Sequence, residues 1–148
     1  MNLERYIIEY DKIINNLDKV VEKIVLSKKG WLLGEMKKRL YNQGIDGNGR
    51  KMGTYSKRSI TERKEIGGLT TGHVTLRRKG DWYKGMTIKS NGKFSFNIIS
   101  EDWKNDKLLD MYGEAILEPT KEELNNFVRV YIDREIEELI RKLGNIES

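Results

Sequence analysis

The chain has 148 residues, 37% of them hydrophobic and 34% charged, with a net charge of +5 and no cysteine. This length suits one domain rather than two separate cores, and the lack of cysteine excludes a disulfide framework and thiolate metal sites. No run approaches the roughly 18 apolar residues of a membrane span, and the charged N-terminal stretch is unlike a signal peptide. The low apolar fraction is typical of a chain completed by its neighbours, so we expect a homo-oligomer and no membrane contact.

The first element is expected to be a long helix. Apolar residues recur at spacings of three and four over residues 3–26, which places them on one helical stripe. Gly30 is expected to interrupt this helix, because glycine is a poor residue in a helix interior. A second apolar face from Trp31 to Tyr41 then completes a helical arm over residues 1–41. A stripe of about three heptads favours packing on the domain's own sheet over a coiled-coil seam between subunits.

Residues 42–73 are expected to form a loop that carries one short basic helix. Four glycines lie within residues 44–53, a density typical of turns. A calcium-binding register starting at Asp46 would place Lys57 at the twelfth position, where a bidentate glutamate is needed, so we interpret this stretch as a turn. Ser56 is expected to cap the short helix that follows.

Residues 74–100 are expected to form a central antiparallel sheet of three or more strands. Val74-Thr75-Leu76 is β-branched and apolar and predicts one strand, which a turn around Gly80 connects to the next. Alternating residues on both sides of Asn91-Gly92 predict two more strands, because this pair is a strong hairpin signal.

Two helices are expected after the sheet. The first is a short helix over residues 102–112, and the second covers residues 120–143. Thr120 and Glu123 form a capping-box pattern at its start, and Gly144 is expected to cap its end. The residues expected to pack this amphipathic helix on the central sheet are Leu124, Phe127, Tyr131, Ile136 and Leu139. The sequence therefore predicts one α+β domain over residues 1–148.

The pattern of polar residues predicts no catalytic residue, metal site, cofactor or small-molecule substrate. His73, the one histidine, has no orienting carboxylate or further metal ligands close to it in the sequence. Two carboxylate pairs, Asp46 with Asp81 and Glu101 with Asp102, leave a small magnesium-dependent nuclease as a less favoured alternative.

Positive charge is concentrated in the middle of the chain. Residues 49–89 carry eleven basic and three acidic side chains, a net charge of +8, while the rest of the chain carries −3. Such asymmetry suits contact with DNA or with an acidic protein surface, and an ordinary solvated face is the alternative. The aromatic residues Trp82, Tyr83 and Trp103 either stack on bases or, as is commoner, pack against the sheet. The candidate contact residues are Arg50, Lys51, Lys57, Arg58, Arg63, Lys64, Arg77, Arg78 and Lys79.

The same region carries an ordered series of short motifs, at Leu40, Tyr41, Gly44, Ile45, Asp46, Gly49, Tyr55, Ser56, Thr61, Lys64, Val74, Thr75, Leu76, Gly80, Asp81, Trp82 and Tyr83. Their order resembles that of the neck, tail-completion and virion-morphogenesis proteins of tailed phages, especially those of crAss-like phages and Bacteroidetes prophages. The resemblance extends over residues 40–144, whereas residues 1–39 match only as a helix. One departure is Arg78-Lys79-Gly80, because the relatives have Asp-Thr before the glycine and so carry the opposite local charge.

The resemblance implies a non-enzymatic structural protein of the virion, made in the host bacterial cytoplasm. Such a protein forms a homo-oligomeric ring in the head-to-tail connector, or neck, or completes the tail. Its expected partners are portal, neck and tail proteins, with DNA passing nearby in the channel. The residues themselves leave a second class open, a stand-alone basic module that binds nucleic acid.

Overall fold

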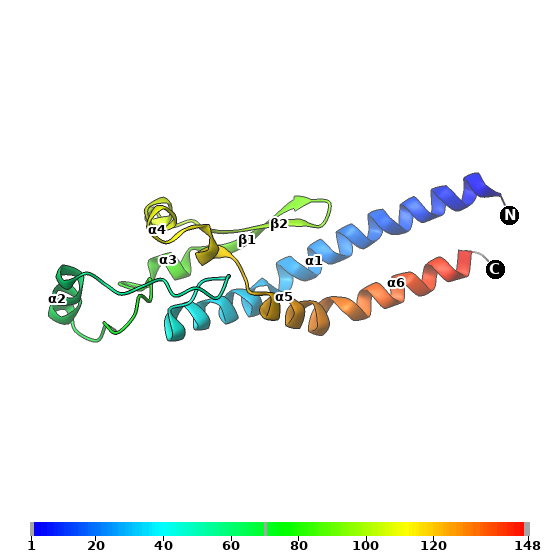
Figure 1. The fold of residues 1–148 in the computed structure, drawn as a ribbon. Helices are drawn as coiled ribbons and strands as arrows, with labels where there is room; N and C mark the ends of the chain where they lie inside the picture. Colours follow the sequence, from blue (N-terminus) through cyan, green and yellow to red (C-terminus); the bar gives the residue numbers. More distant parts are fainter. Residues whose placement is uncertain (1, 70, 147–148) are drawn as a thin grey trace.

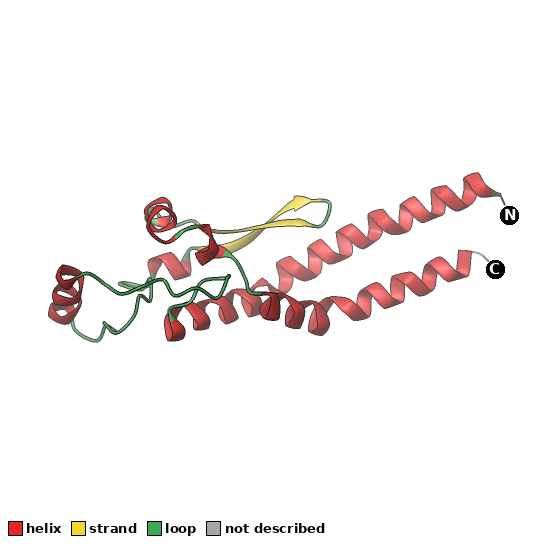
Figure 2. Ribbon diagram, in the orientation of Figure 1, coloured by secondary structure: helices red, strands yellow, loops and turns green. Residues whose placement is uncertain are grey.

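The computed structural model describes residues 2–69 and 71–146, which form an elongated molecule built on one long helix (Figure 1). In these residues the strands make one two-stranded hairpin and the remaining elements are helical (Figure 2). The elements in chain order are α1 (Leu3–Gln43), α2 (Lys57–Ile66), α3 (Asp81–Lys84), β1 (Met86–Gly92), β2 (Ser95–Ser100), α4 (Asn105–Tyr112), the 3-10 helix η1 (Glu114–Leu117), α5 (Lys121–Phe127), the π-helix η2 (Val128–Ile132) and α6 (Asp133–Ile146).

Helix α1 runs unbroken through Gly30, so the interruption expected there is wrong. The side chain of Asn2 accepts a backbone N–H of the first turn, and Gly44, in the left-handed region with φ of 64°, ends the helix. An interior glycine costs up to about 1 kcal/mol relative to alanine. Buried side chains on both sides of the glycine, including Val25 and Leu32, hold the helix against its neighbours and outweigh that cost.

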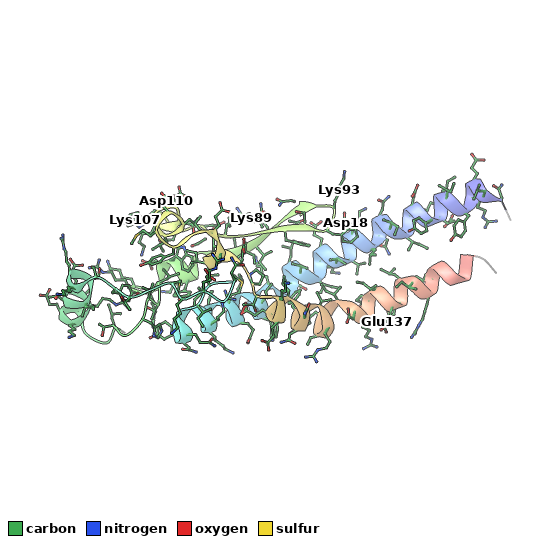
Figure 3. The ribbon with its side chains drawn as sticks, viewed as in Figure 1. Asp18, Lys89, Lys93, Lys107, Asp110 and Glu137 are labelled. Atoms are coloured by element: carbon green, nitrogen blue, oxygen red, sulfur yellow. The ribbon has the colours of Figure 1, made fainter. Side chains whose placement is uncertain are left out.

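Strands β1 and β2 pair antiparallel, which confirms the predicted hairpin. Its turn lies at Lys93 and Phe94, both with positive φ, whereas Asn91-Gly92, where the turn was predicted, forms the end of β1 at an irregularity in the pairing. The hairpin lies along α1, and the buried side chain of Ile88 helps to attach it there. At the hairpin tip, the carboxylate of Asp18 in α1 accepts the backbone N–H groups of Lys93 at 3.2 Å and Phe94 at 3.0 Å (Figure 3). The tip is therefore held by a side chain from the long helix.

The predicted sheet of three or more strands is wrong, because the described residues form only this two-stranded sheet. Val74-Thr75-Leu76 is irregular instead. The backbone N–H of Thr75 donates to the Tyr55 hydroxyl at 2.9 Å, and its carbonyl accepts a hydrogen bond from the Tyr83 hydroxyl. Side chains thus satisfy the backbone groups that a neighbouring strand would otherwise pair. Leu76, with φ of 58°, also lies outside the conformations of a strand.

The turn expected between strands at Gly80 is the start of the short helix α3. Two aromatic residues of α3, Trp82 and Tyr83, are buried, which confirms that they pack in the core. The indole N–H of Trp82 donates to Asn105 at 3.0 Å, and the Ser100 hydroxyl donates to the Trp82 carbonyl at 2.7 Å. Helix α3 is therefore joined to both the hairpin and α4.

The C-terminal helical segment begins as predicted and ends later than predicted. Thr120 and Glu123 form both hydrogen bonds of the capping box, at 2.9 and 3.1 Å. The helix continues past Gly144, so the cap expected there is wrong. Between α5 and α6 the backbone widens into one π-helical turn, η2, which changes the register of the side chains that follow.

The C-terminal segment packs on α1 and not on the sheet, which corrects the predicted arrangement. Trp31 of α1 meets Phe127 and Tyr131, with ring centroids 6.1 and 5.9 Å apart. Of the predicted face, Phe127 and Leu139 are buried while Leu124 is exposed. The physical reason is area: a two-stranded hairpin offers little apolar surface, whereas α1 presents an apolar stripe along its length.

A buried arginine joins three parts of the fold. The guanidinium of Arg39 donates to the carboxylate of Glu123, to the Glu118 carbonyl at 3.0 Å and to the Ile45 carbonyl at 3.1 Å. Glu123 is also the acceptor for the backbone N–H of Thr120. Burial lowers the pKa of Arg39 below its usual value, and the Glu123 carboxylate opposes this change. One ion pair thus connects the end of α1 with the following turn and with the start of α5.

The core lies beside the C-terminal half of α1, enclosed by the hairpin, α3, η1 and α5. Its fully buried side chains include Met36, Leu40, Val74, Trp82 and Ile116. From this body the N-terminal part of α1 and α6 extend side by side in one direction, while α2 lies at the opposite end (Figure 1). We call this pair of helices the projection. In the described part of the chain, none of the helices has the length and apolar character needed to cross a membrane.

Replacing Arg39 by Leu is expected to lower the free energy of unfolding by about 3 to 5 kcal/mol, because Glu123 would keep a buried carboxylate without its cation. Its exposed neighbour Lys38 is the matched control, and Lys38→Leu should change stability by less than about 0.5 kcal/mol. Urea unfolding followed by circular dichroism measures both values. Equal stability of the two variants would contradict the role assigned to Arg39.

Leu139 is buried and Ile140, the next residue of α6, is exposed. Leu139→Asp is expected to lower stability by several kcal/mol, because a carboxylate would be buried without a partner. Ile140→Asp should be nearly neutral. Thermal melting and hydrogen exchange of the α6 amides measure the difference, and similar results for both variants would show that α6 does not pack on α1 in this way.

Candidate interaction surfaces

Helix α2 presents three of the predicted cations to solvent. Its start is capped by Ser56, as the sequence predicts, and the side chains of Lys57, Arg58 and Lys64 are exposed. Arg58 forms an ion pair with Glu62 at 3.2 Å, one helical turn away. Exposed pairs of this kind contribute little to stability, so these cations remain available for contacts with a partner.

Arg63 lies in the interior and is not part of the exposed basic surface. Its guanidinium carbon is 4.2 Å from the centroid of the Tyr55 ring, and the group donates to the Thr75 hydroxyl at 3.2 Å. The same threonine bonds to Tyr55 through its backbone N–H. Arg63 therefore attaches α2 to the irregular segment after it, a structural role that the sequence analysis did not assign.

Arg50 and Lys51 lie on the tight turn that follows α1, and both are exposed. The buried carboxylate of Asp46 accepts the backbone N–H of Arg50 at 3.0 Å and so closes the turn from inside. The backbone N–H of Gly47 donates to the Ala115 carbonyl at 2.8 Å, which attaches the turn to η1. These hydrogen bonds therefore fix the backbone of the turn that carries Arg50 and Lys51.

Arg77 lies against the end of α1. Its guanidinium carbon is 5.7 Å from the centroid of the Tyr41 ring, and it lines a shallow pocket together with Lys37 and Lys84. Tyr83 also lines this pocket. Burial raises the pKa of the Tyr83 hydroxyl, so this group stays protonated and remains a hydrogen-bond donor.

A more distinct groove lies between the residues before α3 and helix α4, and we call it the basic groove. Trp103, which is 83% exposed, is one of the residues that line it. The Lys104 ammonium is 6.0 Å from the centroid of the Trp103 ring and 3.8 Å from the Asp102 carboxylate. The lining combines four cations with three apolar side chains, which are Arg78, Lys79, Lys104 and Lys107 with Trp103, Leu108 and Met111.

The nine predicted contact residues thus lie on four different parts of the fold. Only the three consecutive residues before α3 contribute to the pocket and the basic groove. The division is Lys57, Arg58 and Lys64 on α2, Arg50 and Lys51 on the tight turn, Arg77, Arg78 and Lys79 before α3, and Arg63 in the interior.

The α4 side of the basic groove was not predicted from the sequence. The nine predicted contact residues all lie within residues 49–89, whereas Lys104, Lys107 and Met111 come from the next helical segment. A signal for them was present, because Lys104 and Lys107 are three residues apart, as are Leu108 and Met111, a spacing that places each pair on one side of a helix.

Three of the polar residues considered for chemistry, His73, Glu101 and Asp46, have structural partners. The His73 ring nitrogen Nε2 is 2.8 Å from the Tyr41 carbonyl. Glu101 pairs with Lys89 at 3.3 Å, and Asp46 closes its own turn. In residues 2–69 and 71–146, no three His, Asp or Glu side chains are grouped so as to hold a metal ion.

Comparison of the chain with models of known protein families, with curated proteins and with solved structures finds no match. Inference about function therefore depends on the surfaces of this chain and on the order of its motifs.

The burial of Arg63 generates a prediction for charge reversal on α2. Arg63→Glu is expected to destabilise the fold by at least about 2 kcal/mol, because the stacking and the hydrogen bond to Thr75 are lost and a carboxylate takes their place. Combined Arg58→Glu and Lys64→Glu is the control, with a change below about 0.5 kcal/mol per site. Chemical denaturation measures both, and a stable Arg63→Glu protein would contradict the interior role.

Proposed function

We propose that this protein is a non-enzymatic structural protein of a tailed-phage virion, which assembles as a homo-oligomeric ring in the head-to-tail connector or completes the tail. It would be made in the host cytoplasm and incorporated beside portal, neck and tail proteins, near the DNA channel. Two observations support this proposal: the order of motifs over residues 40–83, and an apolar surface on α1 that the described part of the chain leaves uncovered.

The uncovered apolar surface carries the proposal. The stripe of α1 is buried at Val21, Val25 and further along the helix. Towards the N-terminus the same stripe continues through Leu3, Ile7 and Tyr10, which are 68%, 50% and 42% exposed. We call these three residues the uncovered row. A helix face that is apolar beyond the reach of its own domain is typical of a surface that another chain covers.

A second candidate function is a stand-alone module that binds nucleic acid. The exposed cations of α2 and of the tight turn favour it. Binding of such a module to DNA would weaken steeply with salt, because each phosphate that a cation neutralises releases counterions. Fluorescence anisotropy with duplex and single-stranded oligonucleotides at several salt concentrations separates the two functions, since a ring component need not bind free DNA tightly.

Combined Ile7→Glu and Tyr10→Glu is expected to leave the protein folded but to abolish self-association, because charge replaces the apolar contact. Ile8→Glu is the matched control: Ile8 is also 50% exposed but lies on another side of the helix. Gel filtration with light scattering measures the oligomer, and electron microscopy of assembled particles shows incorporation. A wild-type chain that stays monomeric at high concentration and is missing from assembled particles would refute the proposed function.

A further inference from the structure

We propose that the uncovered row of one copy docks in the basic groove of the next copy, so that identical chains join head to tail. This inference rests on the self-association in the proposed function and names the two surfaces that meet. It is carried by the matching chemistry of the two surfaces and by their separate positions along the molecule.

The uncovered row has acidic side chains on one flank. With about 3.6 residues per turn, Glu4 and Asp11 lie beside the row, whereas Arg5 and Lys12 lie on the far side of the helix. All four side chains are exposed, and Lys12 is paired with Glu9 at 3.3 Å. The N-terminal end of α1 therefore presents apolar side chains with a carboxylate edge.

The basic groove has the complementary character. Trp103 is the most exposed of the large apolar side chains in the described residues, and an accessible tryptophan is a typical anchor of a protein interface. Around it, Arg78, Lys79 and Lys107 form no ion pair with any residue in the described ranges. The groove thus offers an apolar contact edged by three cations, Arg78, Lys79 and Lys107, that pair with no carboxylate among the described residues.

The lining of the basic groove favours a protein segment over a nucleic acid. Two of its three apolar residues, Leu108 and Met111, are aliphatic and cannot stack on bases as aromatic rings do. The lining also includes the carboxylate residue Asp81, and Asp110 lies near Lys107 on the same helix (Figure 3). These acidic groups would repel a continuous chain of phosphates but leave room for isolated carboxylates.

One copy cannot satisfy both surfaces. Helix α1 has 41 residues and is therefore about 60 Å long. The uncovered row lies at its N-terminal end, while α3 and α4 lie in the body of the molecule, toward the end that carries α2 (Figure 1). Contact between two different patches on identical chains is heterologous, and it produces a closed ring when the rotation between copies closes.

Two charge-reversal variants test the inference, one for each surface. Arg78→Glu with Lys107→Glu reverses the groove, and Glu4→Lys with Asp11→Lys reverses the edge of the row. Each variant alone is expected to weaken self-association about tenfold or more, because like charges then face each other. When the two variants are mixed in equal amounts, each carries a surface complementary to the other, so association should return. Light scattering of the separate and mixed proteins measures this.

Lys57→Glu with Lys64→Glu, on exposed positions of α2, is the control for a change of charge alone and should associate as the wild type does. Three results would overturn the inference. In the first, the two charge-reversed variants associate normally although the Ile7→Glu with Tyr10→Glu variant does not. This result would support the ring but show that the basic groove is not part of its interface. In the second, the mixture fails to recover association. In the third, the groove variant loses binding to an oligonucleotide while its self-association is unchanged, which assigns the groove to nucleic acid.

Discussion

The ion pair between Arg39 and Glu123 is the interaction on which the arrangement of the body depends. The arginine is on the last turns of α1, and the glutamate belongs to the capping box of α5, so two residues 84 positions apart in the sequence share one buried contact. The remaining guanidinium donors bind the carbonyls of Ile45 and Glu118. All three guanidinium nitrogens donate to an oxygen, and in the described residues no buried side-chain nitrogen or oxygen lacks a hydrogen-bond partner. This is the condition under which a buried charge is tolerated.

Helix α1 acts as the scaffold for everything else. The hairpin, α5 and α6 each lie on it, and Asp18 holds the hairpin tip. The helix is longer than the elements that cover it, which is why its stripe is buried at Val21 and exposed at Leu3. Because α1 is longer than the elements that cover it, its N-terminal part extends into the projection and exposes the apolar surface from which we infer assembly.

Of the basic residues in 49–89, some pack within the fold and others are exposed on its surface. Arg63 is buried with its guanidinium carbon 4.2 Å from the centroid of the Tyr55 ring, whereas Arg77, 5.7 Å from the centroid of the Tyr41 ring, is still exposed. The other basic residues on α2 and before α3 are also exposed. Net charge in a stretch of sequence therefore overestimates the charge that a partner meets, because part of it holds the fold together.

Local patterns in the sequence determined the elements with local causes: the helical segments on both sides of Gly30, the cap at Ser56, the hairpin of β1 and β2, and the capping box at Thr120. Each depends on backbone preferences and contacts between residues a few positions apart. Only the tertiary structure decided which groups form hydrogen bonds with the backbone of Thr75, which helices pack on α1, and where Arg63 lies. These outcomes depend on partners that are distant in the sequence, such as Tyr55 and Tyr83 for Thr75. The basic groove belongs to the same class: it joins residues before α3 with residues of α4, and no spacing along the chain brings these two segments together.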